Sequence, residues 1–101
     1  MSRLGQSLLA LSFMAVAALP AAAQVTVDVS KITCQQYILF AVGDPHDIAV
    51  WLSGYFNGIR QNTVLDTQQF REHAKKVMDF CESNPKSLVM DSVERVLGVK
   101  H

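Results

Sequence analysis

The sequence predicts an all-α protein, a small four-helix domain stapled by one disulfide. Three observations support this fold class. Apolar residues recur at the 3.6-residue spacing of amphipathic helices. Helix-capping motifs stand in front of these segments. The chain of 101 residues also contains two cysteines, Cys34 and Cys81, and no others.

Residues 1–23 have the pattern of a secretory signal peptide, which is cleaved on export. Arg3 is followed by an apolar run from Leu8 to Leu19, and small residues precede Gln24. This run is too short to cross a bilayer comfortably. A retained anchor or a buried first helix is the alternative interpretation. We therefore expect an exported mature chain of 78 of the 101 residues, without membrane insertion after signal cleavage.

A domain of this size buries a marginal core, so a covalent cross-link is expected. Cys34 and Cys81 are the only candidates, and export to an oxidising compartment favours their pairing. In the chain-entropy model, closing a loop of this length stabilises the fold by about 4 kcal/mol. Two cysteines without a nearby histidine pair form a poor ligand set, so we expect no metal.

The charge pattern excludes several functions. After loss of Arg3, eight Lys and Arg residues face nine carboxylates, and no basic stripe for nucleic acid is present. The residue pattern also contains no nucleophile paired with a base, no set of metal ligands and no convergent pair of acids. We therefore expect neither an enzyme nor a cofactor. In strong acid the carboxylates lose their charge, and the three histidines bring the positive charges to eleven.

The predicted helical domain spans residues 33–98, between an N-terminal arm at residues 24–32 and a C-terminal tail at residues 99–101. In the arm, Val25, Val27 and Val29 alternate with polar residues, which predicts an extended segment. A disordered leader is the alternative.

The first helix is predicted over residues 34–41. Thr33 and Gln36, three positions apart, match a capping box at its start. Gly43 is a natural stop after its end. Cys34 then lies in the first turn.

The second helix has the strongest local signals. Asp44 is the predicted N-cap, Pro45 fits the first helical position, and Asp47 lies beside the positive end of the helix dipole. Gly54 and Gly58 interrupt the apolar residues and predict a close approach by a neighbouring element, with fraying as the alternative. The apolar face consists of Ile48, Trp51, Leu52, Tyr55, Phe56 and Ile59.

Two further helices follow. Asp66 is the predicted N-cap of the third, whose apolar spacing places Cys81 on its buried face. The fourth is predicted to begin with Asn84 as N-cap and Pro85 at the first helical position, and to end at Gly98.

The aromatic face of the second helix is larger than a four-helix miniature can cover. A plain core is one interpretation of this face. An apolar surface in excess of the core indicates instead a dimer seam or a groove for a partner.

The segments "TCQQYI", "PHDIAVWLSGYFNG", "TVLDTQQF" and "VMDFCESNP" resemble the HdeA/HdeB family of periplasmic acid-stress chaperones over about residues 32–97. The resemblance implies a small all-helical fold with one disulfide, located in the periplasm. It implies an ATP-independent holdase that is a homodimer near neutral pH and binds acid-denatured periplasmic proteins. Mapped by motif, the dimer and client surface includes Trp51, Leu52, Tyr55 and Phe56.

Four residues are candidates for an acid switch. Asp44, Asp47 and Asp66 lie at helix starts, where protonation weakens a cap or removes a favourable charge. His46 gains a positive charge beside the positive end of a helix. We expect acid to produce a loosened chain that the disulfide still holds.

A second function remains open. The better-studied members of the family carry lysine-rich termini, whereas the terminal basic residues here are Lys31, Lys100 and His101. The alternative is a constitutive exported interaction module or subunit, which docks one specific partner through the face of the helix at residues 44–61.

Overall fold

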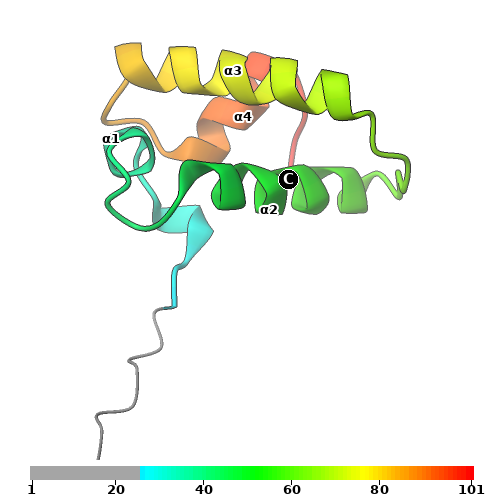
Figure 1. The fold of residues 1–101 in the computed structure, drawn as a ribbon, viewed down its shortest axis with the longest axis horizontal. Coiled ribbons are helices and arrows are strands. Elements are labelled where there is room, and N and C mark those ends of the chain that lie inside the picture. The colour runs from blue at the N-terminus through cyan, green and yellow to red at the C-terminus, as the bar shows by residue number, and fades with distance from the viewer. Residues whose placement is uncertain (1–25) are drawn as a thin grey trace, which may run out of the picture.

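The computed structural model describes residues 26–101, which form an all-α domain closed by one disulfide, as predicted (Figure 1). The predicted signal peptide and the first two residues of the arm lie outside the described residues. No strand occurs among residues 26–101, where one isolated bridge pairs Thr33 with Leu88. The elements are a 3-10 helix η2 (Val29–Lys31) and the helices α1 (Cys34–Ile38), α2 (Pro45–Ile59), α3 (Thr67–Ser83) and α4 (Val89–Leu97).

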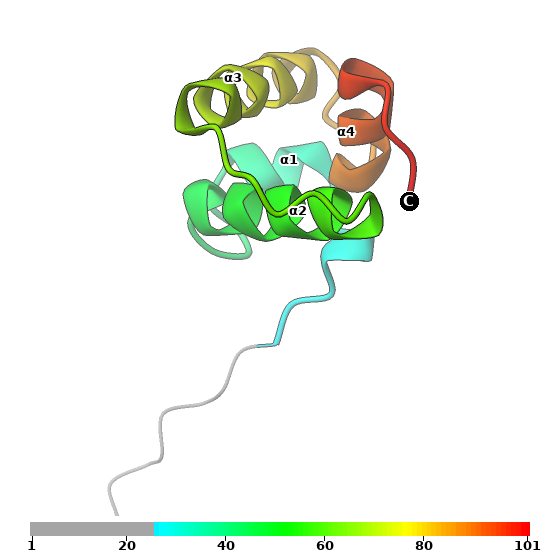
Figure 2. The ribbon, with the colours of Figure 1, turned by 90° about the vertical axis from the view of Figure 1, so that its right-hand side faces the viewer.

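The helices surround a core that is centred on the disulfide. α3 packs on α1 and α4, whereas α2 packs mainly on α1 and makes few close backbone approaches to α3 (Figure 2). Cys34 and Cys81 are fully buried, and their Cα atoms are 4.8 Å apart. The Oγ atom of Ser92, on α4, lies 3.2 Å from the Cys34 Sγ atom. The cross-link therefore joins α1 to α3 at a point that α4 also contacts.

Three of the predicted N-terminal caps are present. The Gln36 backbone N–H donates to the Thr33 hydroxyl oxygen. In return, the Thr33 backbone N–H donates to the side-chain carbonyl oxygen of Gln36, which completes the capping box. Asp44 caps α2, with Pro45 in the first turn. Asp66 caps α3. Each cap satisfies a backbone N–H group that has no partner within its helix.

The end of α1 differs from the prediction, because the helix stops at Ile38 instead of residue 41. Phe40 has a φ of +58°, and the Ala41 N–H group turns back to the Gln36 carbonyl at 3.0 Å. This left-handed closure ends helices and usually employs glycine. The sequence offered Gly43 as the stop, but the chain turns three residues earlier.

The start of α4 was also predicted wrongly. The helix begins at Val89, and Asn84 instead ends α3, where its side-chain amide donates to the Phe80 carbonyl at 2.9 Å. Gly98, with a φ of +70°, ends α4 as predicted.

Residues 85–88 are not helical because their backbone pairs with the segment that leads into α1. The Cys34 N–H group donates to the Ser87 carbonyl at 2.7 Å, and the Val89 N–H group donates to the Ile32 carbonyl at 2.9 Å. Such pairing satisfies backbone groups that a longer α4 would have satisfied internally. A contact between distant parts of the chain therefore overrides the local Asn-Pro signal.

The predicted extended arm is partly helical and belongs to the core. Val29 and Ile32 are buried with the four helices, and residues Val29–Lys31 form η2. Asp28 caps this turn by accepting from the backbone N–H and the hydroxyl group of Ser30, at 3.1 and 2.6 Å. The core thus begins before residue 33.

The predicted close approach to Gly54 and Gly58 was wrong. Both glycines are exposed, and a Cβ atom built on either would meet nothing within 4 Å. Within the described chain, the backbone of α2 is therefore open to solvent at these two positions.

Candidate functional site

The apolar face predicted on the second helix is divided between the core and the surface. Ile48, Leu52 and Phe56 are buried and belong to the core cluster. Their contribution to a dimer or client surface is therefore possible only after this packing loosens. These residues point toward the other helices because they lie four positions apart along α2.

The exposed half of this face is aromatic. Trp51 is 46% exposed, and its ring stacks on that of Tyr55 with centroids 5.1 Å apart and planes 12° apart. Tyr55 is half-buried and meets the ring of Phe56 edge-on at 5.3 Å. Val50 and Ile59 are also exposed on α2. The surface aromatic pair is therefore continuous with the core, and we refer to Trp51 and Tyr55 as the outer aromatic pair.

Two further exposed apolar pairs were missed from the sequence. Leu39 and Phe40 follow α1, and Val64 and Leu65 lie in the connector to α3; all four are more than 60% exposed. The first pair was assigned to the first helix and the second to a connector, so neither was considered as a surface. The available signal for an exposed apolar surface was the position of these apolar residues beside a helix end.

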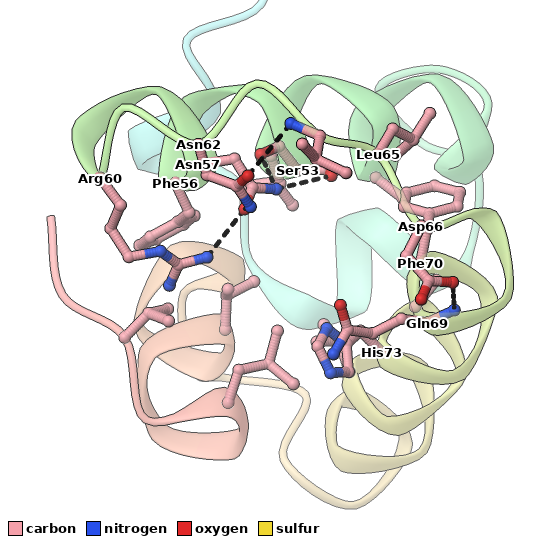
Figure 3. Close-up of a pocket in the computed structure, with 18 of the residues that line it drawn as sticks. Ser53, Phe56, Asn57, Arg60, Asn62, Leu65, Asp66, Gln69, Phe70 and His73 are labelled. Carbon is pink, nitrogen blue, oxygen red and sulfur yellow. Dashed lines mark hydrogen bonds between the residues drawn. The ribbon is translucent and has the colours of Figure 1, made fainter.

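A cavity of about 420 Å³ lies between α2, α3 and α4 (Figure 3). Its walls bring together side chains from all three helices and the connector. Apolar residues from the core line it, namely Leu52, Phe56, Val77, Val93 and Leu97. The polar side chains that line it are Ser53, Asn57, Arg60, Asn62, Asp66, Gln69 and His73.

The four candidates for an acid switch lie at two helix starts. At the start of α2, Asp44 accepts from the His46 backbone N–H at 2.9 Å, and the His46 Nδ1 atom lies 3.8 Å from Asp47. Asp66 lies at the start of α3 and accepts from the Gln69 N–H at 2.9 Å. All four are exposed. The structure therefore brings together Asp44, His46 and Asp47, and the His46 ring also lies 6.2 Å from that of Phe70 on α3, the helix that Asp66 caps.

Asp28 is an acid-sensitive group that the sequence analysis missed. The hydroxyl and then the backbone N–H of Ser30, with Lys31 nearby, lower the pKa of its carboxyl group. Its position two residues before a serine was the available signal for a cap. Its hydrogen bonds hold the turn of η2, which contains buried Val29 and precedes buried Ile32.

The C-terminal residue links α4 to α2. The imidazole Nδ1 atom of His101 lies 2.5 Å from a carboxylate oxygen of Glu94. The same ring lies 6.1 Å from the Phe56 ring and 6.2 Å from the Tyr55 ring. The end of the predicted C-terminal tail therefore contacts the inner end of the outer aromatic pair.

No three His, Cys, Asp or Glu side chains within residues 26–101 lie close enough to hold a metal ion. In the same part of the chain, no helix has the length and apolar content needed to cross a membrane.

The chain matches a protein-family model over residues 4–91, and that model is described as "HdeA: HdeA/HdeB family". No curated protein and no solved structure matches the chain.

Proposed function

Because the chain belongs to the HdeA/HdeB family of periplasmic acid-stress chaperones, we propose that it is an ATP-independent periplasmic holdase, exported by its N-terminal signal peptide. It binds acid-denatured proteins through an apolar surface and prevents their aggregation until neutral pH returns. The family consists of chaperones, not enzymes.

The continuity of the outer aromatic pair with the core is the observation that carries this proposal. Trp51 and Tyr55 offer an apolar contact surface in the folded chain, and Tyr55 touches buried Phe56. Loosening of α2 extends that surface inward over Leu52 and Phe56. Aromatic side chains contribute much apolar area and tolerate many partners, as an unspecific client site requires.

Acid favours loosening of α2 for two reasons. Protonation of Asp44 replaces the carboxylate that caps α2 with a neutral carboxyl group, which is a weaker acceptor, and protonation of Asp66 does the same at α3. The neutralised carboxylates also leave the positive charges unbalanced, which destabilises a compact chain by repulsion.

The arrangement of the helices determines which part loosens. α1 and α3 are joined by the disulfide and share α4 as a neighbour, whereas α2 packs mainly on α1. The disulfide does not titrate. Acid therefore releases α2 more readily than the part of the fold around Cys34 and Cys81.

Near neutral pH the protein is a homodimer in which the outer aromatic pair faces a second copy. Trp51, Val50 and Ile59 are large apolar side chains left about half exposed in the single chain. Gly54 leaves open backbone beside them, so a second copy has room to approach. Covering this face at neutral pH keeps it from binding proteins that are still folded.

Light scattering of an unrelated acid-labile protein tests the proposal. The test protein is shifted to between about pH 2 and pH 4 and back, with and without the disulfide-bonded chain. We expect suppressed scattering in acid and no effect at neutral pH. Trp51→Ser should reduce this protection, while Val64→Ser, which removes an exposed apolar side chain from the connector, should preserve it.

The alternative function is a constitutive module that docks one specific partner through α2. The exposed face of α2 fits this function equally well at neutral pH. A docking module binds its partner near neutrality and protects no unrelated protein. Absence of protection at every pH would therefore reject the holdase and favour the module.

A further inference from the structure

The cavity between α2, α3 and α4 is separate from the exposed face of α2. Trp51 and Tyr55, which form the outer aromatic pair, do not line it. Its volume of about 420 Å³ lies within the range of small-molecule sites, and its apolar walls come from the core.

A network of side-chain amides holds one cation at this cavity. The Arg60 Nη2 atom donates to the Asn57 Oδ1 atom at 2.8 Å. The Asn57 Nδ2 group donates to the Ser53 carbonyl at 2.8 Å, and the Asn62 Nδ2 group donates to the Asn57 Oδ1 atom at 3.1 Å. Asn57 is thus fixed from two sides and orients the guanidinium group (Figure 3).

The end of α2 is folded so that this network forms. Gln61 has a φ of +55°, and the Asn62 N–H group donates to the Asn57 carbonyl at 2.9 Å. A left-handed conformation is uncommon for a residue other than glycine. It turns the chain back so that the side chain of Asn62 reaches Asn57.

Arg60 pairs with no carboxylate among the described residues. Three other ionisable groups line the cavity, and one of them is the buried Tyr37 phenol. Asp66 lies on the opposite side from Arg60, and its carboxylate accepts from the Gln69 N–H (Figure 3). His73 is half-buried on α3. One end of the cavity therefore has a solvent-exposed guanidinium group that forms no ion pair with the described residues.

We infer that this cavity binds a small amphiphilic anion, with one carboxylate or sulfonate group and an unbranched apolar tail. The anionic group lies on the Arg60 guanidinium, which suits the paired oxygens of a carboxylate. The tail lies on the apolar wall formed by Leu52, Phe56 and Leu97. This binding occurs at neutral pH in the folded chain, so the inference does not rest on the proposed acid-stress function.

Calorimetric titration of the purified, disulfide-bonded protein with octanoate at neutral pH tests the inference. Octan-1-ol, which has the same tail and no charge, is the matched ligand. We expect saturable binding of one octanoate per chain. Octan-1-ol should bind about tenfold more weakly than octanoate, because it cannot form the charged hydrogen bonds to Arg60.

Two variants separate this site from general charge attraction. Arg60→Gln should weaken octanoate about tenfold and leave octan-1-ol unchanged, because it removes the charge and keeps a polar side chain of similar reach. Arg71→Gln removes the same charge from an exposed position on α3 outside the cavity and should have no effect. Far-ultraviolet circular dichroism checks that both variants are folded.

The location of binding is measured by backbone amide chemical shifts. Octanoate should shift resonances of Asn57, Asn62 and His73 more than those of Trp51. The inference is overturned by absence of saturable binding, by equal affinity for octan-1-ol, or by equal losses in Arg60→Gln and Arg71→Gln. Shifts confined to the exposed face of α2 overturn it as well.

Discussion

Trp51 and Leu52 are neighbours in the sequence but lie on opposite sides of the boundary between surface and core. Trp51 stacks on Tyr55 in partial contact with solvent, and Leu52 is buried at 4% exposure. Successive residues on a helix point about 100° apart, so one wide apolar face serves both regions. Substitutions at these two positions should therefore have separable effects.

Trp51→Ala should lower the free energy of unfolding by only about 1 kcal/mol, the value of a partly exposed aromatic contact. Leu52→Ala should lower it by about 2–5 kcal/mol, because it empties part of the core. Urea unfolding at neutral pH measures both. Equal losses at the two positions would contradict the assignment of Trp51 to the surface.

Phe40→Gly should raise the stability or leave it unchanged, although it removes a large apolar side chain. Phe40 is 65% exposed and has a φ of +58°, a conformation that costs about 1–2 kcal/mol in a residue with a Cβ atom. Leu39→Gly is the matched control, since Leu39 is similarly exposed but has a φ of −95°. The urea midpoint of Phe40→Gly should be higher than that of Leu39→Gly. The reverse order would show that the backbone at Phe40 is not strained.

Asp28→Asn should destabilise the domain at neutral pH and have no effect in strong acid. Hydrogen bonds from Ser30 lower the pKa of Asp28 from its unfolded value of 3.8. A lowered folded-state pKa gives stability that is present above pH 3.8 and is lost as pH falls through the folded value. Urea unfolding of both proteins at pH 7 and about pH 2 measures the difference.

The Ser30→Ala variant provides the control for this pH dependence. It removes the hydroxyl that donates to Asp28 at 2.6 Å and should reproduce part of the loss at neutral pH. Equal stability of Asp28→Asn and the unchanged protein at pH 7 would show that the negative charge of Asp28 adds nothing to this cap, because asparagine keeps an acceptor oxygen.

Replacing both Cys34 and Cys81 by serine should unfold the chain even at neutral pH. The cross-link is worth about 4 kcal/mol in the chain-entropy model, which approaches the whole stability of so small a domain. Circular dichroism and size-exclusion chromatography distinguish an expanded chain from a folded one. A folded double variant with unchanged urea midpoint would show that packing alone maintains the domain.

Local signals predicted the helix starts well where the cap is within a few residues of its partner. Thr33, Asp44 and Asp66 each accept from a backbone N–H two or three residues away. The Asn84-Pro85 signal has the same form and failed. Its backbone pairs with residues near Cys34, some fifty positions upstream, and no local pattern reports such a contact.

The candidate site was predictable in part. Periodicity identified the apolar face of α2, but not that Leu52 lies inside while Trp51 lies outside, because this depends on where α1 and the other helices pack. The cavity was not predictable, since Arg60, His73 and Leu97 meet there from three helices. The contact of His101 with Glu94 likewise depends on the path of the chain after Gly98.

Acid should expose the apolar face of α2 while the disulfide keeps the chain joined. Fluorescence of an uncharged apolar dye such as Nile red, titrated from pH 7 to about pH 2 with the oxidised protein, tests it most directly. A neutral dye is required because the chain becomes strongly cationic in acid. We expect a reversible rise in dye emission below about pH 4, where carboxylates lose their charge. Unchanged emission down to pH 2 would contradict it.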